Sequence, residues 1–439
     1  MRIDEKPLHG GNLRYASDKF KNVENSFIDF SASINPLGVP QLIKRALYDA
    51  VNDGVEKYPD PESLVLVAAL AEYHGVDTNC VLPGNGASEI LDIALRAFIT
   101  DLRRPPRVLI IAPSFSGYAA VAKGCEVTTF QLSEEDEFAI DVDRLDEALR
   151  RAEQPYDVLM LGNPNNPTSS MIEPDKLLEM LKPHMEAGLF VIVDEAFIEL
   201  TLGGERNSLL NSIKKETANQ PNGLPNGLTN GLTNGLSNVL PKCDASSFHD
   251  WHHNLLIVRA LTKSYSLPGV RLGYGISSAW RLGKMRSVQV EWSVNAFAQS
   301  VGSVFLRLDD YRKETAVWAE TEIPFMYEAL REIPGFKVFK PSANFILMKI
   351  TNEKLDRDVY SADAKFDRDV YSANAKLGRD ELEGSIFDAD ALSTELALNY
   401  NILIRDASNF QGLDERFFRV AVRNREENLL LINALKTVK

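Results

Sequence analysis

Short apolar runs alternate with amphipathic stretches through the first two thirds of the chain. Buried strands are predicted at 108–112 (VLIIA), 158–162 (VLMLG), 190–194 (FVIVD) and 255–259 (LLIVR). Helices are predicted between them, near 87–99, 143–153 and 174–187. Apolar runs of this length, separated by helices, indicate parallel strands joined by crossover helices. The pattern therefore predicts an α/β fold with a mostly parallel sheet and helices on both of its faces.

The last third of the chain predicts a second, smaller α/β unit. Its apolar runs are FILMKI (345–350), NILIR (401–405) and FFRVAV (417–422). We expect a large domain over 41–300 and a small C-terminal domain over 301–439. Residues 1–40 are expected to form an N-terminal arm and part of the small domain.

Two low-complexity segments interrupt this pattern. One repeats NGL with a period of four over 222–238, inside a predicted surface loop at 213–250. The other repeats DRDVYSA after eleven residues within 356–376, inside a predicted insertion at 354–382 that could form a short exposed helix. Both resemble tandem expansions of surface loops, and neither is assigned a catalytic role.

Charge and cysteine content narrow the class of protein. The 439 residues are 44% hydrophobic and carry a net charge of −14, so nucleic acid and anionic membranes are poor partners. An anionic ligand must instead be held by a few local arginines. Three widely spaced cysteines argue against a disulfide framework, and no apolar stretch is long enough to span a membrane. We therefore expect a cytoplasmic protein.

Candidate chemistry follows the predicted strands. Asn163 to Thr168, Asp194 and Lys263 each follow one apolar run, and active sites of parallel sheets gather at the carboxyl ends of strands. The amine of Lys263 could form an imine with an aldehyde, and the guanidinium of Arg271 could hold a phosphate on that aldehyde. A surface lysine and a helix-capping arginine are the alternatives.

Two further motifs could bind the same flat, phosphorylated ligand. GNGASE (84–89) is a glycine-rich turn before a predicted helix, where backbone N–H groups and the Ser88 hydroxyl suit a phosphate. Phe115 in APSFSGY lies just after a strand and could stack on a planar ring. The alternatives are a helix N-cap and a core aromatic residue, respectively.

Two polar residues suit the edge of such a ring. Asn166 in GNPNNPTSS could donate to a phenolate oxygen, although an Asn-rich turn explains the motif equally well. Asp194 in VIVDEAF could pair with a protonated ring nitrogen, with a helix N-cap as the alternative.

The order and spacing of these motifs resemble the class I/II pyridoxal-phosphate aminotransferase superfamily, whose members have fold type I. The resemblance implies pyridoxal 5'-phosphate as cofactor and Lys263 as the catalytic lysine that forms the imine with it. It also implies cofactor contacts from Gly86, Ala87, Ser88, Phe115, Asn166, Asp194 and Arg271. Tyr58 matches a tyrosine that reaches the cofactor phosphate of the neighbouring subunit, which implies a homodimer. Ala260 departs from the superfamily, which often has Ser or Thr there, and Thr262 could compensate.

Within the superfamily, four segments resemble the L-threonine-O-3-phosphate decarboxylases of cobalamin biosynthesis. They are HGGN (9–12), DFSASINPLG (29–38), EWSVNAFA (291–298) and the terminal stretch 402–423. Phe197 stands where the aminotransferases usually have a tyrosine, and it too matches the decarboxylases. The resemblance implies a lyase acting on a phosphorylated amino acid, with substrate contacts from His9, Asn35, Arg405 and Arg419.

Other readings stay open. For each arginine taken alone, a surface salt bridge is the alternative. O-Phospho-L-serine, smaller by one methyl group, is a rival substrate. A histidinol-phosphate aminotransferase would share every cofactor residue, and a non-catalytic cofactor-binding protein is a third hypothesis. No metal site is expected, because Cys243, His249, His252 and His253 match no strong zinc spacing.

Overall fold

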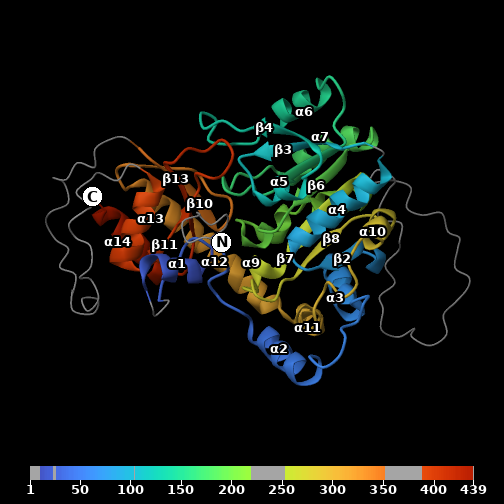
Figure 1. Ribbon diagram of the computed structural model, residues 1–439, viewed down its shortest axis with the longest axis horizontal. Coiled ribbons are helices and arrows are strands. Elements are labelled where there is room, and N and C mark those ends of the chain that lie inside the picture. Colours follow the sequence, from blue (N-terminus) through green and yellow to red (C-terminus); the bar gives the residue numbers. More distant parts are fainter. Residues whose placement is uncertain (1–9, 23–25, 103, 219–252, 352–387, 439) are drawn as a thin grey trace, which may run out of the picture. The chain divides into compact units, whose positions relative to one another are not determined.

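The computed structural model describes residues 10–22, 26–102, 104–218, 253–351 and 388–438 (Figure 1). The chain forms two compact units. The larger comprises Ile34–Asn166 and Ser170–Ala319, and the smaller comprises Met1–Ser33, Pro167–Ser169 and Glu320–Lys439. These boundaries lie at 33/34 and 319/320, whereas the sequence suggested 40/41 and 300/301. The NGL repeat and the DRDVYSA repeat lie outside the described residues.

A seven-stranded mixed sheet forms the centre of the larger unit, with the order β2-β8-β7-β6-β5-β3-β4. Neighbouring strands from β4 to β7 run parallel, while β8 is antiparallel to β7 and to β2. The strands are β2 (Val81–Gly84), β3 (Arg107–Ala112), β4 (Glu126–Gln131), β5 (Val158–Gly162), β6 (Phe190–Asp194), β7 (Leu255–Ala260) and β8 (Gly273–Ile276).

The predicted strands are confirmed in position and direction. β5 and β6 have the predicted bounds, β3 begins one residue earlier, and β7 ends one residue later. Three strands were not predicted, and each lacks a long apolar run. β4 is a largely exposed edge strand, β2 contains Pro83, and β8 has glycine at alternate positions.

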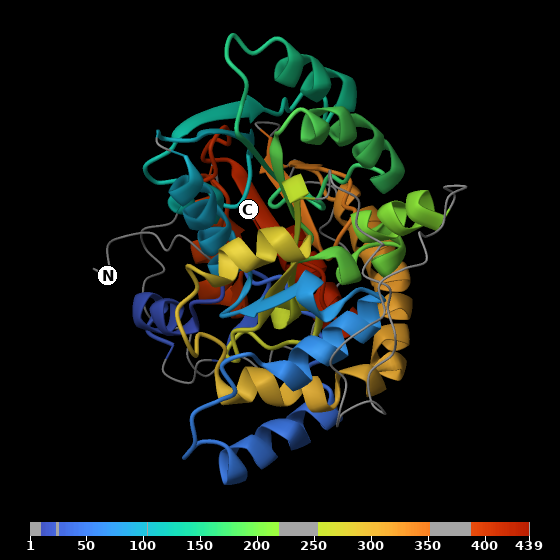
Figure 2. The same ribbon diagram turned by 90° about the vertical axis from the view of Figure 1, so that its right-hand side faces the viewer.

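Helices of the larger unit surround this sheet (Figure 2). They are α2 (Gln41–Asp53), α3 (Leu64–His74), α4 (Ala87–Asp101), α5 (Gly117–Val121), α6 (Val142–Arg150), α7 (Pro174–Glu186), α8 (Leu209–Ala218), α9 (Leu261–Ser264), α10 (Ala279–Arg286) and α11 (Ala296–Ser300). The three predicted helices correspond to α4, α6 and α7.

Burial on both sides of β6 explains its apolar run over 190–193. Successive side chains of a strand point to opposite faces, yet all five residues of β6 are buried. Ile192 joins a core cluster with Ile90 and Leu91 of α4, while Val191 and Val193 point to the opposite face. A polar side chain within 190–193 would lack water, so an apolar run suits this central strand up to Asp194 at its end.

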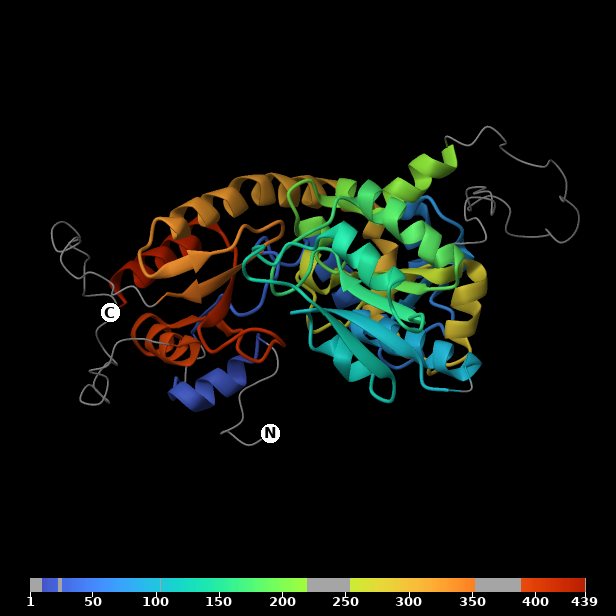
Figure 3. The same ribbon diagram turned by 90° about the horizontal axis from the view of Figure 1, so that it is seen from above.

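A four-stranded antiparallel sheet, ordered β12-β13-β10-β9, lies in the smaller unit (Figure 3). Its strands are β9 (Phe336–Val338), β10 (Phe345–Ile350), β12 (Arg405–Asp406) and β13 (Phe417–Ala421). β1 (Ile28–Asp29) pairs with β11 (Ile402–Leu403). The helices are α1 (Leu13–Phe20), α13 (Ala389–Tyr400) and α14 (Arg425–Thr437), with α12 (Asp309–Arg331) continuing in from the larger unit. No helix in the described ranges is long and apolar enough to cross a membrane.

Candidate active site

Three neighbouring strands bring the predicted chemistry to one edge of the large sheet. β5, β6 and β7 lie side by side and parallel, so the residues after them share that edge. The backbone N–H of Asn163 donates to the carbonyl oxygen of Asp194 at 2.9 Å. Lys263 lies in α9, directly after β7. The sheet order therefore confirms the prediction that the segments after these strands lie at one edge of the sheet.

Asp194 ends β6 as a nearly buried carboxylate. One oxygen accepts from the backbone N–H of Ala196 at 2.9 Å, and the other accepts from the hydroxyl of Tyr118 at 3.0 Å. The pKa of Asp194 is raised to about 6: burial is the largest cause and the nearby charge of Glu195 adds to it, while the two hydrogen bonds act in the opposite direction. A protonated ring nitrogen would favour the charged form and complete the site.

Tyr118 is a site residue that the sequence analysis did not identify. It lies in α5, three residues after Phe115, and is fully buried. A Cβ atom on Gly162 would lie 3.0 Å from its hydroxyl oxygen, so the glycine leaves room for this contact with β6. The APSFSGY motif contained Tyr118, but nothing in it showed which aromatic ring faces the carboxylate.

The glycine-rich turn and the side chain of Arg271 lie close together, as the predicted phosphate site requires. Gly86 is the N-cap of α4, with φ 80° and ψ 167°, and no side chain caps this helix among the described residues. A Cβ atom on Gly86 would lie 3.0 Å from Cζ of the Arg271 guanidinium. A Cβ atom on Gly273 would collide with the backbone of Ala87, so strand β8 can approach the turn only as glycine.

This arrangement forms a cradle for an anion. The N–H groups of Ala87 and Ser88 occupy the first positions of a 15-residue helix, where no intrahelical acceptor exists and the helix dipole favours negative charge. Ser88 is exposed. A guanidinium, two backbone N–H groups and a hydroxyl are a donor set that fits a phosphate. The alternative of a helix N-cap is therefore also true, because Gly86 is the N-cap residue of α4 and, lacking a side chain, leaves the space for an anion free.

The segment that carries Lys263 is anchored by Asn35. The N–H of Asn35 donates to the carbonyl oxygen of Lys263 at 3.0 Å, and its side-chain Nδ2 donates to the carbonyl of Ser264 at 2.9 Å. The Nζ atom of Lys263 lies 5.9 Å from the ring centroid of Phe197. The structure therefore brings together the lysine and the aromatic residue that the sequence singled out far apart in the chain.

The remaining predicted cofactor residues lie in the same unit. Phe115 is partly buried and makes an edge-to-face contact with Tyr118, with centroids 5.7 Å apart. Asn166 is partly buried in the turn after β5. Tyr58 is 82% exposed and its ring lies 5.0 Å from that of Trp292. Ala260 ends β7 without a hydroxyl, and the nearby Thr262 is buried.

The smaller unit holds the predicted substrate arginines as a buried pair. Arg405 on β12 and Arg419 on β13 are directly opposite in the antiparallel ladder and are 7% and 6% exposed. Burial and then the charge of Arg405 lower the pKa of Arg419 to about 9, and burial also lowers the pKa of Arg405. An anion bound between them would relieve both effects. His9 lies outside the described residues.

Comparisons with known proteins assign the chain to a family. The family model for aminotransferase class I and II matches residues 25–435. The chain therefore belongs to the class I and II aminotransferases, which are pyridoxal-phosphate enzymes. The threonine-phosphate decarboxylase of Salmonella typhimurium is 31% identical, with coverage of 98% of this chain and 96% of that protein.

Two further proteins are similar to this chain. The adenosylcobalamin biosynthesis bifunctional protein CobDQ of Leptospira interrogans is 27% identical over 98% of this chain, which corresponds to 41% of that protein. The structure of the histidinol-phosphate aminotransferase from Clostridium acetobutylicum is 27% identical, with a TM-score of 0.69 and coverage of 94% and 98%. The predicted family and fold class are thus confirmed.

Proposed function

We propose that this chain is a pyridoxal-phosphate-dependent decarboxylase of L-threonine O-3-phosphate. Its product would be the amino alcohol phosphate of the cobamide side arm, and O-phospho-L-serine is the rival substrate. The buried pair Arg405 and Arg419 carries the proposal, because two desolvated guanidinium groups suit a substrate with a carboxylate and a phosphate. The named activities of the Salmonella and Leptospira relatives support the same substrate and pathway.

The larger unit supplies the proposed cofactor site. The cofactor phosphate would be held by Gly86, Ala87, Ser88 and Arg271, and the ring nitrogen would pair with Asp194. Asn166 would bond the ring hydroxyl, Phe115 would stack on the ring, and Lys263 would bind the cofactor aldehyde. Bound pyridoxal phosphate supplies an electron sink for the bond that breaks at Cα.

Substrate positioning decides which bond breaks. We assign Arg419 to the substrate carboxylate, and Arg405, His9 and Asn35 to its other polar groups. By fixing the carboxylate, Arg419 would set the orientation of the substrate toward the cofactor, and this orientation would select loss of CO₂ over amino transfer. Phe197 has no hydroxyl with which to bond the ring oxygen, in contrast to the tyrosine usual in the aminotransferases. This difference favours the decarboxylase over the histidinol-phosphate aminotransferase alternative.

We further propose a cytoplasmic homodimer. Tyr58 is exposed, and other apolar side chains of the larger unit are also more than half exposed in the single chain, namely Tyr48, Val51, Val55, Leu64, Val65 and Val290. Exposed apolar groups in such number suit a protein partner. In a dimer of this kind, the ring of Tyr58 would reach the cofactor phosphate of the second subunit.

A single assay panel tests the proposed function. The purified chain is incubated with pyridoxal phosphate and with phosphothreonine, phosphoserine, or histidinol phosphate plus 2-oxoglutarate. We expect CO₂ from one or both phosphoamino acids and no amino transfer, with activity lost in Lys263→Ala. Amino transfer without CO₂ release would replace the decarboxylase by the aminotransferase. No turnover of any substrate would leave only a non-catalytic, cofactor-binding protein.

A further inference from the structure

A buried ion pair lies beside the proposed cofactor residues and has no role in the site described above. Nη1 of Arg259 is 2.8 Å from Oε2 of Glu195, and the two side chains are 2% and 0% exposed. Glu195 directly follows Asp194, and Arg259 precedes Lys263 by four residues on β7. Fully buried charges are rare, so a pair beside two functional residues calls for an explanation.

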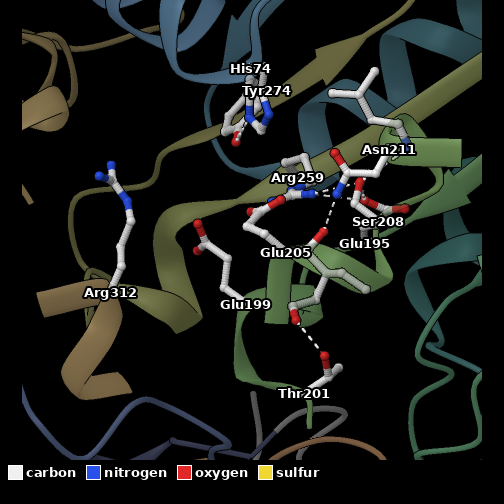
Figure 4. A network of polar contacts seen from close by, with 12 residues as sticks. His74, Glu195, Glu199, Thr201, Glu205, Ser208, Asn211, Arg259, Tyr274 and Arg312 are labelled. Atoms are coloured by element: carbon white, nitrogen blue, oxygen red, sulfur yellow. Dashed lines mark hydrogen bonds and ion pairs between the residues drawn. The ribbon is translucent and has the colours of Figure 1, made fainter. Parts of the chain in front are cut away.

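The carboxylate of Glu195 accepts hydrogen bonds from several donors. Besides Arg259, the hydroxyl of Ser208 donates to Oε2 and the backbone N–H of Leu209 donates to Oε1, both at 2.7 Å. Arg259 also bonds Ser208 and Glu205 (Figure 4). If Arg259 were lost, Ser208 and Leu209 would still donate hydrogen bonds to the carboxylate of Glu195. A negative charge would then remain next to Asp194 without its counter-charge.

That charge acts directly on the carboxylate that faces the cofactor. Glu195 is one of the groups that raise the pKa of Asp194, after burial itself. The hydroxyl of Tyr118 donates to Asp194, and burial raises the pKa of this tyrosine, so it stays a neutral hydrogen-bond donor. An uncompensated Glu195 would therefore favour protonation of Asp194, which in turn could no longer pair with a protonated ring nitrogen.

The remaining groups around Arg259 keep it charged. Burial alone would lower its pKa, but Tyr274, Glu195, Glu199 and Tyr73 raise it above the usual value. Tyr274 is opposite Arg259 in the β7–β8 ladder. Behind Tyr274, the buried ring of His74 lies 2.7 Å from the tyrosine hydroxyl, and burial lowers the pKa of His74 so that it stays neutral (Figure 4).

We propose that Arg259 is a positioning residue for the cofactor: it compensates the charge of Glu195 and thereby lets Asp194 remain a carboxylate facing the ring nitrogen. The inference deepens the proposed function and rests on its cofactor site. It predicts that Arg259 affects cofactor affinity through the ring nitrogen of the ligand and not through its phosphate.

The test measures dissociation constants of the cofactor-free chain between about pH 5.5 and 8.5, for pyridoxal phosphate and for an analogue with carbon in place of the ring nitrogen. Affinity for pyridoxal phosphate should fall as the pH is lowered, and in Arg259→Met the midpoint of this fall should lie at least about one pH unit higher than in the wild type. Near pH 6 this shift corresponds to about tenfold weaker binding. Binding of the carbon analogue should stay within about threefold of the wild type, well below that tenfold step. The double variant Glu195→Gln/Arg259→Met should recover the wild-type profile, because the charge adjacent to Asp194 is removed together with the arginine that compensates it.

Arg281→Met is the matched control. Arg281 is 3% exposed in the same unit, but its side chain donates to neutral acceptors, the carbonyl of His253 and the side chain of Asn254. Its profile should match the wild type for both ligands. If Arg259→Met does not fold, Glu195→Gln alone tests the idea, because its acid limb should move to lower pH.

Several results would overturn the inference. Equal weakening for both ligands in Arg259→Met, no recovery in the double variant, or an unmoved acid limb in Glu195→Gln would each leave the pair a packing element. These outcomes differ from failure of the proposed function. A chain that binds pyridoxal phosphate as predicted but releases no CO₂ refutes the function and leaves the role of Arg259 intact.

Discussion

Replacement of Gly86 by alanine is predicted to weaken cofactor binding through two separable effects. The backbone at Gly86 has φ 80° and ψ 167°, a region that is essentially restricted to glycine. Forcing an L residue into it costs about 1–3 kcal/mol of stability. In addition, the new Cβ would press on the Arg271 guanidinium, with Cζ 3.0 Å away, so the arginine must move.

The second effect sets the magnitude for the cofactor. Moving Arg271 forfeits a charge-assisted hydrogen bond to the phosphate, worth about 1.5–3 kcal/mol. Since about 1.4 kcal/mol corresponds to a factor of ten, the dissociation constant of pyridoxal phosphate should rise about 10- to 100-fold. Titration of the cofactor-free protein with pyridoxal phosphate, followed by visible absorbance, measures this value directly.

Gly188→Ala is the control for backbone strain alone. Gly188 has φ 103°, and a Cβ atom there would meet nothing within 4 Å. Denaturant unfolding should show a loss of stability in both variants, whereas only Gly86→Ala should bind the cofactor more weakly. If Gly86→Ala binds pyridoxal phosphate as tightly as Gly188→Ala, the assignment of this turn and Arg271 to the phosphate is wrong.

The remaining predictions concern single side chains of the two units. Because Asp194 has a folded-state pKa of about 6 against an ordinary value of 3.8, the cofactor-free protein should lose about 3 kcal/mol of unfolding free energy as pH rises through that interval. Asp194→Asn should remove this loss, and unfolding curves that keep the same pH dependence would contradict the burial of a charge there. Tyr118→Phe should weaken pyridoxal phosphate binding by about 1 kcal/mol, since a donor to Asp194 is lost; unchanged affinity would remove the tyrosine from the site. Arg419→Met should cost about 2–5 kcal/mol of transition-state stabilisation with phosphothreonine, which lowers kcat/KM at least about 30-fold, and it should leave the affinity for pyridoxal phosphate unchanged. A loss of cofactor affinity instead would place the arginine in the wrong role.

Long apolar runs made the larger unit predictable. β3, β5, β6 and β7 are buried on both faces, so their sequences contain almost no polar interruptions, and their parallel pairing follows from the helices between them. The edge strand β4 has a polar, exposed sequence, and β2 and β8 contain proline or glycine at positions set by their neighbours. Such strands exist because of their partners, which a local pattern does not reveal.

The candidate site divides in the same way. The order of Gly86, Asp194, Lys263 and Arg271 indicated the cofactor, because each lies in a short motif after a strand or before a helix. Tyr118 and the Glu195–Arg259 pair stayed hidden, since their roles depend on contacts between segments 64 or more residues apart. Nothing in their own neighbourhoods distinguishes them from ordinary core or surface residues.

By itself the sequence determined the fold class, the family and the identity of the residues that could hold a phosphorylated aldehyde. Those properties follow from local periodicity and from motifs whose spacing is carried by the chain. Only the tertiary structure decided that Arg271 lies close to Gly86, that Tyr118 donates to Asp194, and that Arg405 and Arg419 are paired in the β12–β13 ladder. Electrostatic environment depends on burial and on distances between remote segments, so the pKa values near Asp194 and Arg419 exist only in the folded chain.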